Sequence, residues 1–140
     1  MAARQCALTF MEGTRRLAAS FTGGAFNHGP SELLEKGFSV VILRSAGSSR
    51  PLSSSLAARA AALGAEVVVL GAPPAEGVEG ALSVEVPGIS GRLAAPGADQ
   101  DELFPLLLCR VQNLLLHEVA ARRGHEAGVF RNGAKVTTHE

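Results

Sequence analysis

The sequence contains no tryptophan, no tyrosine and only six phenylalanines. Proteins that hold single-stranded nucleic acid usually stack its bases on aromatic side chains, and such a platform is nearly absent here. A sugar would likewise have to be held by polar groups rather than by an aromatic face. The shortage of rings therefore directs attention to the polar side chains.

The chain also lacks an excess of charge of either sign. Thirteen Lys and Arg residues balance thirteen Asp and Glu residues, so the formal net charge at pH 7 is zero. Such a chain produces no long-range field that attracts nucleic acid or an anionic membrane. The composition therefore disfavours a polyanion-binding role, and we expect neither nucleic acid nor a membrane among its partners.

Cysteine is rare, with Cys6 and Cys109 as the only two. Their positions lack the paired spacing of a disulfide framework or a zinc site, which favours a reduced cytoplasmic protein with both thiols packed in the core. The histidines at 117, 125 and 139 do not have metal-ligand spacing either. No dinucleotide fingerprint or Walker lysine is present. We therefore predict no metal site and no cofactor.

Long uninterrupted hydrophobic runs are missing as well. The longest apolar stretch, Leu103 to Val119, contains Arg110 and other polar residues. A membrane-spanning helix needs about 20 predominantly apolar residues, so this stretch is predicted to be a core helix of a soluble protein. Charged residues between positions 4 and 16 also break the opening segment, which argues against a signal peptide.

What the sequence does have is enough apolar material for one domain. Its 140 residues are 46% hydrophobic and 19% charged, a balance typical of a chain that buries a core. The β-branched runs over 38–43 and 66–70 predict strands buried on both faces of a parallel sheet. Between them, apolar residues at helical spacing from Leu52 to Leu63 predict a helix that ends at Gly64. Strand, helix and strand in this order predict a right-handed βαβ unit.

The first part of the chain is predicted to form two helices. Apolar residues recur at helical spacing over residues 4–21, and the glycine turn at 22–24 is expected to end this helix. Pro30, whose fixed φ suits a first helical turn, precedes a short helix predicted over 31–36. His28 is then expected to lie close to the N-terminus of that short helix.

The last part predicts a third strand and a long helix. The strand is expected over 82–86, and the helix runs to about residue 123 with Pro105 in its first turn. A polar tail follows over 124–140. Three strands are fewer than the about five of a typical parallel sheet. We therefore expect a sheet that is incomplete at its N-terminal edge and belongs to a fragment or needs an obligate partner.

Three side chains are candidates for acid–base chemistry. His28 lies beside a predicted helix N-terminus, whose dipole disfavours the imidazolium and keeps a neutral acid–base group available. Glu12 on the first helix approaches it if the chain folds back at the glycine turn. Lys135 is one of only two lysines and supplies a titratable amine. The alternatives are a surface or capping histidine, a solvated helix-face glutamate and a solvated tail lysine.

A serine-rich loop lies between the first predicted strand and the following helix. Hydroxyls at Ser48 and Ser49, together with N–H groups of the helix N-terminus, form a pattern that cradles phosphate. Helix capping and loop solvation explain the same serines equally well.

Together these segments resemble the C-terminal sugar isomerase (SIS) subdomain of glucosamine-6-phosphate synthase and related SIS sugar-phosphate isomerases. The resemblance rests on several segments that follow one another in the order and at the separation seen in this family. They are the Met11-Glu12 helix, the Phe26-Asn27-His28-Gly29-Pro30 loop, the strand at 38–43, the strand entry at 64–67, and the tail at 131–140.

The resemblance implies an α/β fold, a flavodoxin-like three-layer parallel sheet. It implies a partial SIS domain over 1–123 and a tail over 124–140 that completes the active site. In such enzymes two SIS subdomains and a dimer interface enclose that site, and the phosphate-binding loop belongs to the first subdomain. A homodimer or a companion SIS half is therefore expected as a partner.

The resemblance also implies residue roles. Glu12 matches the glutamate that moves a proton between C1 and C2 of a sugar phosphate, and His28 matches the histidine that helps open the sugar ring. Lys135 matches the tail lysine that contacts the open-chain carbonyl. Arg131 belongs to the same tail motif and, with Ser48 and Ser49, is a candidate for binding the substrate.

The implied function is one half of an amino-sugar or ketose phosphate isomerase or aminotransferase, with chemistry of the fructose 6-phosphate to glucosamine or glucose 6-phosphate type. The family commonly has an acidic and a basic residue where this chain has Ala25 and Asn27. These departures favour the alternative of a non-catalytic phosphosugar-binding or regulatory SIS module. A truncated remnant is a further alternative that the sequence does not separate from the other two.

Overall fold

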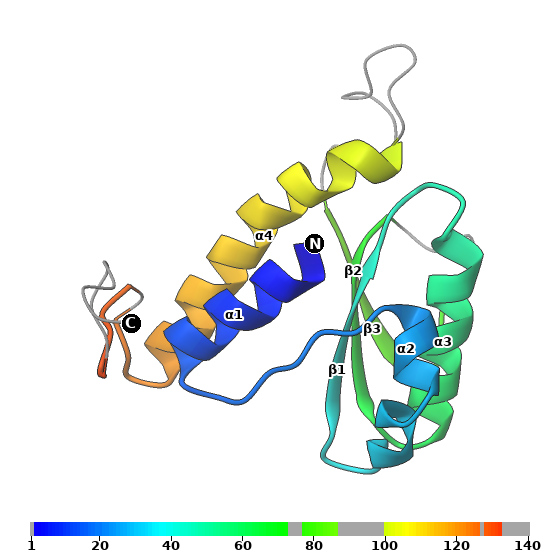
Figure 1. The fold of residues 1–140 in the computed structure, drawn as a ribbon, viewed down its shortest axis with the longest axis horizontal. Helices are drawn as coiled ribbons and strands as arrows, with labels where there is room; N and C mark the ends of the chain where they lie inside the picture. The colour runs from blue at the N-terminus through cyan, green and yellow to red at the C-terminus, as the bar shows by residue number, and fades with distance from the viewer. Residues whose placement is uncertain (1, 73–76, 87–99, 127, 133–140) are drawn as a thin grey trace. The chain divides into compact units, whose positions relative to one another are not determined.

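The computed structural model describes residues 2–72, 77–86, 100–126 and 128–132 (Figure 1). Contacts divide the chain into two compact units. The sheet unit comprises Phe21–Leu108, and the helical unit comprises Met1–Ser20 with Cys109–Glu140.

The sheet unit is built on a parallel sheet in the order β1-β2-β3. Its strands are β1 (Ser39–Arg44), β2 (Glu66–Gly71) and β3 (Ala81–Glu85). The register pairs Val40 with Val67 and Val67 with Ala81. The predicted α/β class is confirmed, and all three strands lie within about a residue of their predicted positions. The fold is flavodoxin-like, with three strands in the part of the chain that the structure describes.

Helix α3 (Arg50–Ala62) connects β1 to β2 and packs on one face of the sheet (Figure 1). Ile42 from β1 shares the buried core with Ala57 and Ala60 of the helix. The prediction that the strand is buried on both faces is wrong for β1, because Val41 is 52% exposed. In β3, for which no such burial was predicted, Leu82 is 63% exposed. Successive side chains of a strand point to opposite faces, so packing on α3 buries only alternate residues.

The predicted glycine stop of α3 is confirmed. Gly64 has a φ of 89°, in the left-handed region that glycine adopts without strain. The N–H of Gly64 donates to the carbonyl of Ala61, and the N–H of Ala65 donates to that of Ala60. This pair of bonds is the Schellman closure, which satisfies carbonyls left over at the helix end.

The helical unit contains α1 (Ala2–Thr14) and most of α4 (Gln100–Arg122). Cys6 Sγ donates to Gln112 Oε1 at 2.7 Å, and the amide nitrogen of Gln112 donates back to the Cys6 carbonyl at 3.2 Å and also to Thr9 Oγ1. A Cβ on Gly13 would lie 2.7 Å from Leu116 Cδ1. Glycine therefore allows α1 to approach α4 closely within this unit.

The first helix is shorter than predicted. It ends at Thr14, and Arg15 has a φ of 56°, which does not continue an α-helix. Leu17, one of the apolar residues that suggested a longer helix, is 94% exposed. The glycine turn at 22–24 begins a helix instead of ending one, because α2 spans Gly23–Asn27.

Two other boundaries also differ from the predictions. The segment predicted as a helix over 31–36 is a 3-10 turn, η1 (Pro30–Leu33). Helix α4 begins at Gln100, so Pro105 lies inside it and not in its first turn. The C-terminal end near residue 123 is confirmed. Among the described residues, no helix is long and apolar enough to cross a membrane.

The prediction that both cysteines pack in the core is wrong for Cys109, which is exposed, whereas Cys6 is partly buried. Burial raises the pKa of the Cys6 thiol, the nearby Cys109 raises it further, and a backbone hydrogen bond opposes both effects. Because the thiolate is the reactive form, this combination protects Cys6.

We expect iodoacetamide at pH 8 to alkylate Cys109 before Cys6, as followed by peptide mass spectrometry over time. A Cys109→Ser variant should then retain only the slow reaction. Equal rates at the two thiols, or faster modification of Cys6, would contradict this description of their environments.

Candidate functional site

His28 lies on a short loop of the sheet unit that is held at several points. Thr22 begins α2, and its Oγ1 accepts a hydrogen bond from the Ala25 N–H. Phe26 is buried in the core and its ring lies 5.9 Å from that of Phe21. Asn27 Oδ1 accepts a hydrogen bond from the Arg59 guanidinium of α3. These contacts anchor the segment that leads into His28.

Within this loop, His28 itself is exposed and caps the C-terminus of α2 through its backbone N–H, which donates to the Ala25 carbonyl. Gly29 follows with a φ of 141°, a conformation that residues with a Cβ rarely adopt. Pro30 then starts η1. The imidazole is therefore presented to solvent by an anchored loop, which suits a proton-transfer group.

Glu12 lies in the last turn of α1 and is exposed. Its neighbour Thr14 is completely buried, and the hydroxyl of Thr14 donates to the Phe10 carbonyl at 2.6 Å. Cys6, Thr9 and Gly13 contact α4. These three residues occupy the packed face of α1, so Glu12 is left available to a ligand.

The tail candidates are only partly described. Arg131 lies in a bend of the helical unit and is exposed, and Lys135 lies outside the described residues. Arg131 and Glu12 therefore belong to the helical unit, whereas His28, Ser48 and Ser49 belong to the sheet unit.

Ser48 and Ser49 lie in the turn between β1 and α3, and both are exposed. Ser49 is the N-cap residue of α3, but its side chain makes no capping hydrogen bond. Its Oγ instead lies 3.0 Å from the Oγ of buried Ser45. The Ser49 hydroxyl therefore does not cap α3 and is instead hydrogen-bonded to Ser45.

A buried cation lies at the end of β1. Arg44 is only 1% exposed, and its Nε donates to the Ala72 carbonyl at 2.8 Å while Nη1 donates to Ser54 Oγ at 3.4 Å. Burial lowers the pKa of Arg44, and the nearby charge of Arg50 lowers it further. Among the described residues, no carboxylate pairs with this guanidinium. Ionised groups are rarely buried without a counter-charge, so the burial of Arg44 is unusual.

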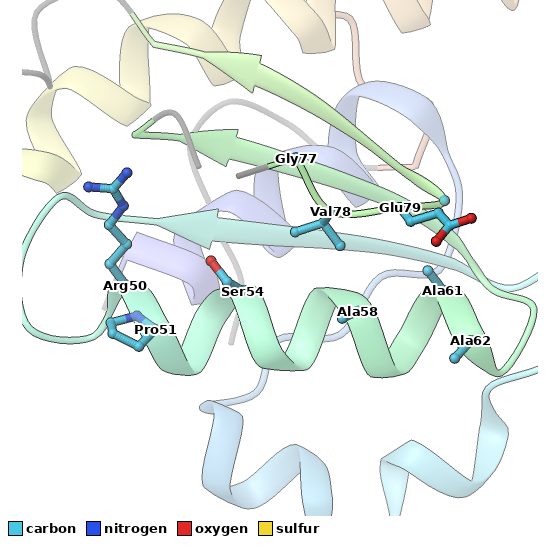
Figure 2. A pocket seen from close by; sticks show the side chains of 10 residues that line it. Arg50, Pro51, Ser54, Ala58, Ala61, Ala62, Gly77, Val78 and Glu79 are labelled. Carbon is cyan, nitrogen blue, oxygen red and sulfur yellow. The ribbon is translucent and has the colours of Figure 1, made fainter. Parts of the chain in front are cut away.

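A groove of about 940 Å³ runs along α3 beside the segment that precedes β3 (Figure 2). Figure 2 shows Arg50 and Ser54 at one end of the groove and Glu79 at the other. Its middle is formed by small apolar side chains, including Ala58, Ala61 and Val78. The volume lies in the range of small-molecule sites.

The sequence analysis did not single out Arg44 or Arg50, and it did not predict the groove along α3. The predicted strand ended at Leu43, whereas β1 includes Arg44. The available signal was alternation, because Val40, Ile42 and Arg44 share one face of a period-two strand. The groove had no sequence signal, since it requires α3 and residues 77–80 to lie side by side.

Comparison with known proteins finds matches among solved structures only. No protein-family model matches the chain, and no curated protein matches it. The C-terminal domain of glucosamine-fructose-6-phosphate aminotransferase from Francisella tularensis aligns with a TM-score of 0.72 and 19% identity over 90% of this chain. Tagatose-6-phosphate ketose/aldose isomerase from Escherichia coli aligns with a TM-score of 0.67 and 22% identity over 96% of this chain.

The fold is of the sugar isomerase (SIS) type. This confirms the fold that the sequence resemblance implied. The chain spans about a third of the length of the solved structures it matches, covering 33% of the aminotransferase domain and 37% of the tagatose-6-phosphate isomerase. At these identities the likeness establishes the SIS-type architecture alone.

Proposed function

We propose that this chain is one SIS half of an isomerase or aminotransferase that acts on a ketose or amino-sugar phosphate, with chemistry of the fructose 6-phosphate type. The observation that carries this proposal is the combination of an SIS-type fold with an anchored loop that exposes His28. An imidazole held in this way is suited to transfer a proton to or from a sugar oxygen.

The proposed chemistry needs three groups. Conversion of a ketose to an aldose passes through an enediol, so a base must move a proton between C1 and C2. We assign this role to Glu12, ring opening to His28, and polarisation of the open-chain carbonyl to Lys135. Arg131, Ser48 and Ser49 are assigned to substrate binding. This scheme uses protein side chains alone and calls for no metal or redox cofactor.

The proposed assembly pairs this chain with a second SIS unit, either in a homodimer or as a companion half, in the cytoplasm. Residues 124–140 are proposed to complete the active site of a domain formed by residues 1–123. The lengths of the two solved structures support such pairing, because each is about three times as long as the region that this chain matches.

Thermal unfolding with and without ligands tests the proposed substrate class. We expect fructose 6-phosphate to raise the unfolding midpoint of the assembled protein and unphosphorylated fructose to leave it unchanged. A ligand that binds only the native state stabilises it by about 2.7 kcal/mol at 100 times its Kd.

The control is the chain alone under the same conditions, which shows whether binding depends on the companion half. Stabilisation by fructose 6-phosphate without any turnover would favour the non-catalytic phosphosugar-binding module. If no sugar phosphate stabilises either preparation, the proposed function is wrong.

A further inference from the structure

We propose that Cys6 and Cys109 form a reversible disulfide when the chain reacts with a peroxide, and that this bond ties α1 covalently to α4. Both thiols are free and lie in the helical unit. Neither is assigned to catalysis or to substrate binding, so the inference does not rest on the proposed function. In reducing compartments, disulfides are usually transient and redox-sensing, and a pair of cysteines on two packed helices suits that use.

The first support is the contact that places the Cys6 thiol on α4. Its Sγ donates to Gln112 Oε1 at 2.7 Å, and the Gln112 amide nitrogen donates back to the Cys6 carbonyl at 3.2 Å. A helical side chain covers the turn that precedes its own Cα, so the Gln112 amide is directed toward the turn that carries Cys109. Cys109 is three residues before Gln112, a spacing that makes side chains neighbours on a helix surface. The Cys6 sulfur is therefore held beside the turn of α4 that carries the second thiol.

The second support is the course of the two helices. Cys6 contacts Gln112, and further along both helices Gly13 lies against Leu116. Because the contacts advance along both segments, α1 and α4 run side by side in the same direction (Figure 1). Cys109, one turn before Gln112, therefore lies level with the N-terminal half of α1, which contains Cys6. A disulfide requires Cα atoms within about 7 Å of each other, and closely packed helices bring facing Cα atoms into that range.

The third support is the unlike exposure of the two thiols. Cys109 is exposed, so a peroxide can reach it, whereas Cys6 is partly buried. Burial raises the pKa of the Cys6 thiol, and the charge of Cys109 raises it further. The second of these effects requires the two sulfurs to lie near each other. An accessible thiol that is oxidised first, beside a second thiol that resolves the product, is the usual arrangement of a redox-sensing pair.

The proposed oxidation takes place in two steps. The Cys109 thiolate attacks one oxygen of hydrogen peroxide, which breaks the O–O bond and leaves Cys109 as a sulfenic acid. The departing hydroxide takes up the proton that the Cys109 thiol lost and becomes water. The Cys6 thiolate then attacks the Cys109 sulfur, which breaks the S–O bond and forms the S–S bond, and the second hydroxide takes up the Cys6 proton. Two thiols thus lose two electrons, and one peroxide is reduced to two molecules of water.

Treatment of the reduced full chain with an equimolar amount of hydrogen peroxide at slightly alkaline pH tests this pairing. Mass spectrometry without reductant is expected to find a monomer that is lighter by two hydrogen atoms, with the peptides of Cys6 and Cys109 joined. Dithiothreitol should reverse the change. The midpoint of thermal unfolding should be several degrees higher in the oxidised chain, because the bond closes a loop that contains the whole sheet unit.

Matched variants separate the two steps. In Cys6→Ser, dimedone is expected to trap a sulfenic acid at Cys109, because the resolving thiol is missing. The double variant Cys109→Ser/Arg110→Cys keeps an exposed thiol on α4 but moves it to a position that does not neighbour Gln112 on the helix surface. This variant should also form a sulfenic acid and should not link to Cys6. In urea, the original chain should form the bond much more slowly than in its native state.

Four results would overturn the proposal. The first is that the native chain accumulates sulfenic acid or disulfide-linked dimers through Cys109 instead of the internal bond. The second is equally efficient linkage in Cys109→Ser/Arg110→Cys, and the third is an equal rate of linkage in urea. The fourth is an unfolding midpoint that does not rise on oxidation, which would show that the bond forms only by distorting the helical unit. None of these measurements requires turnover of a sugar phosphate, so they are independent of the proposed function.

Discussion

Replacement of Gly71 by alanine is expected to abolish the stable fold of the sheet unit. A Cβ at this position would lie 1.8 Å from the Arg44 carbonyl oxygen and 3.1 Å from Phe104 Cε2. The φ of 140° also disfavours any residue with a Cβ. The backbone oxygen cannot move away cheaply, because it accepts the Ala72 N–H at 2.8 Å. We expect a loss of more than about 4 kcal/mol, a large share of the roughly 5–15 kcal/mol by which a native domain is stable.

Denaturant unfolding followed by circular dichroism measures this loss. Gly77→Ala is the matched control, because a Cβ there meets no atom within 4 Å, and its midpoint should stay close to that of the original chain. A Gly71→Ala variant that unfolds within about 1 kcal/mol of the original would show that β1 and β2 do not approach as described.

Replacement of Glu12 by glutamine is expected to lower isomerisation of fructose 6-phosphate by about 10²- to 10⁴-fold in the assembled enzyme, the range typical of a lost general base. Glutamine keeps the size of the side chain but does not accept the proton from C1. Glu12 is exposed, so the free energy of unfolding should change little. The rate of solvent proton exchange at C1, measured by NMR in D2O, should fall in parallel with turnover.

Glu118→Gln is the matched control for this experiment. Glu118 is also an exposed helical carboxylate of the helical unit, and it pairs with Arg122 at 2.6 Å. Its loss should cost at most a few tenths of a kcal/mol in stability and leave the rate unchanged. Full activity of Glu12→Gln in the assembled enzyme would show that another group is the base.

The order of strands and helices was readable because its signals are local. The β-branched runs at 38–43 and 66–70 predicted β1 and β2, and Gly64 predicted the end of α3. The resemblance to SIS subdomains depended on short motifs such as the one around His28, and the SIS-type fold is confirmed. The roles of Glu12, His28 and Lys135 are still predictions.

The end of the first helix could not be predicted from the sequence, because the apolar spacing that favours a helix continues beyond the residue where the helix ends. Apolar spacing up to Phe21 favours a longer helix, but α1 ends at Thr14, just after the residues that contact α4 through Gln112 and Leu116. Residues beyond that contact gain no burial, and most helical stability in proteins comes from tertiary packing. Leu17 is consequently left exposed.

By itself the sequence determined the three strands, the helix between the first two, the last helix, their order, and the parallel α/β class, because those properties follow from the period of apolar residues and from glycine at element ends. Only the tertiary structure decided that Arg44 is buried behind Ser54, that Gly71 has no room for a Cβ, and that Arg50 and Glu79 share one groove. Each of these depends on segments far apart in the chain lying side by side, and no local pattern encodes their distance.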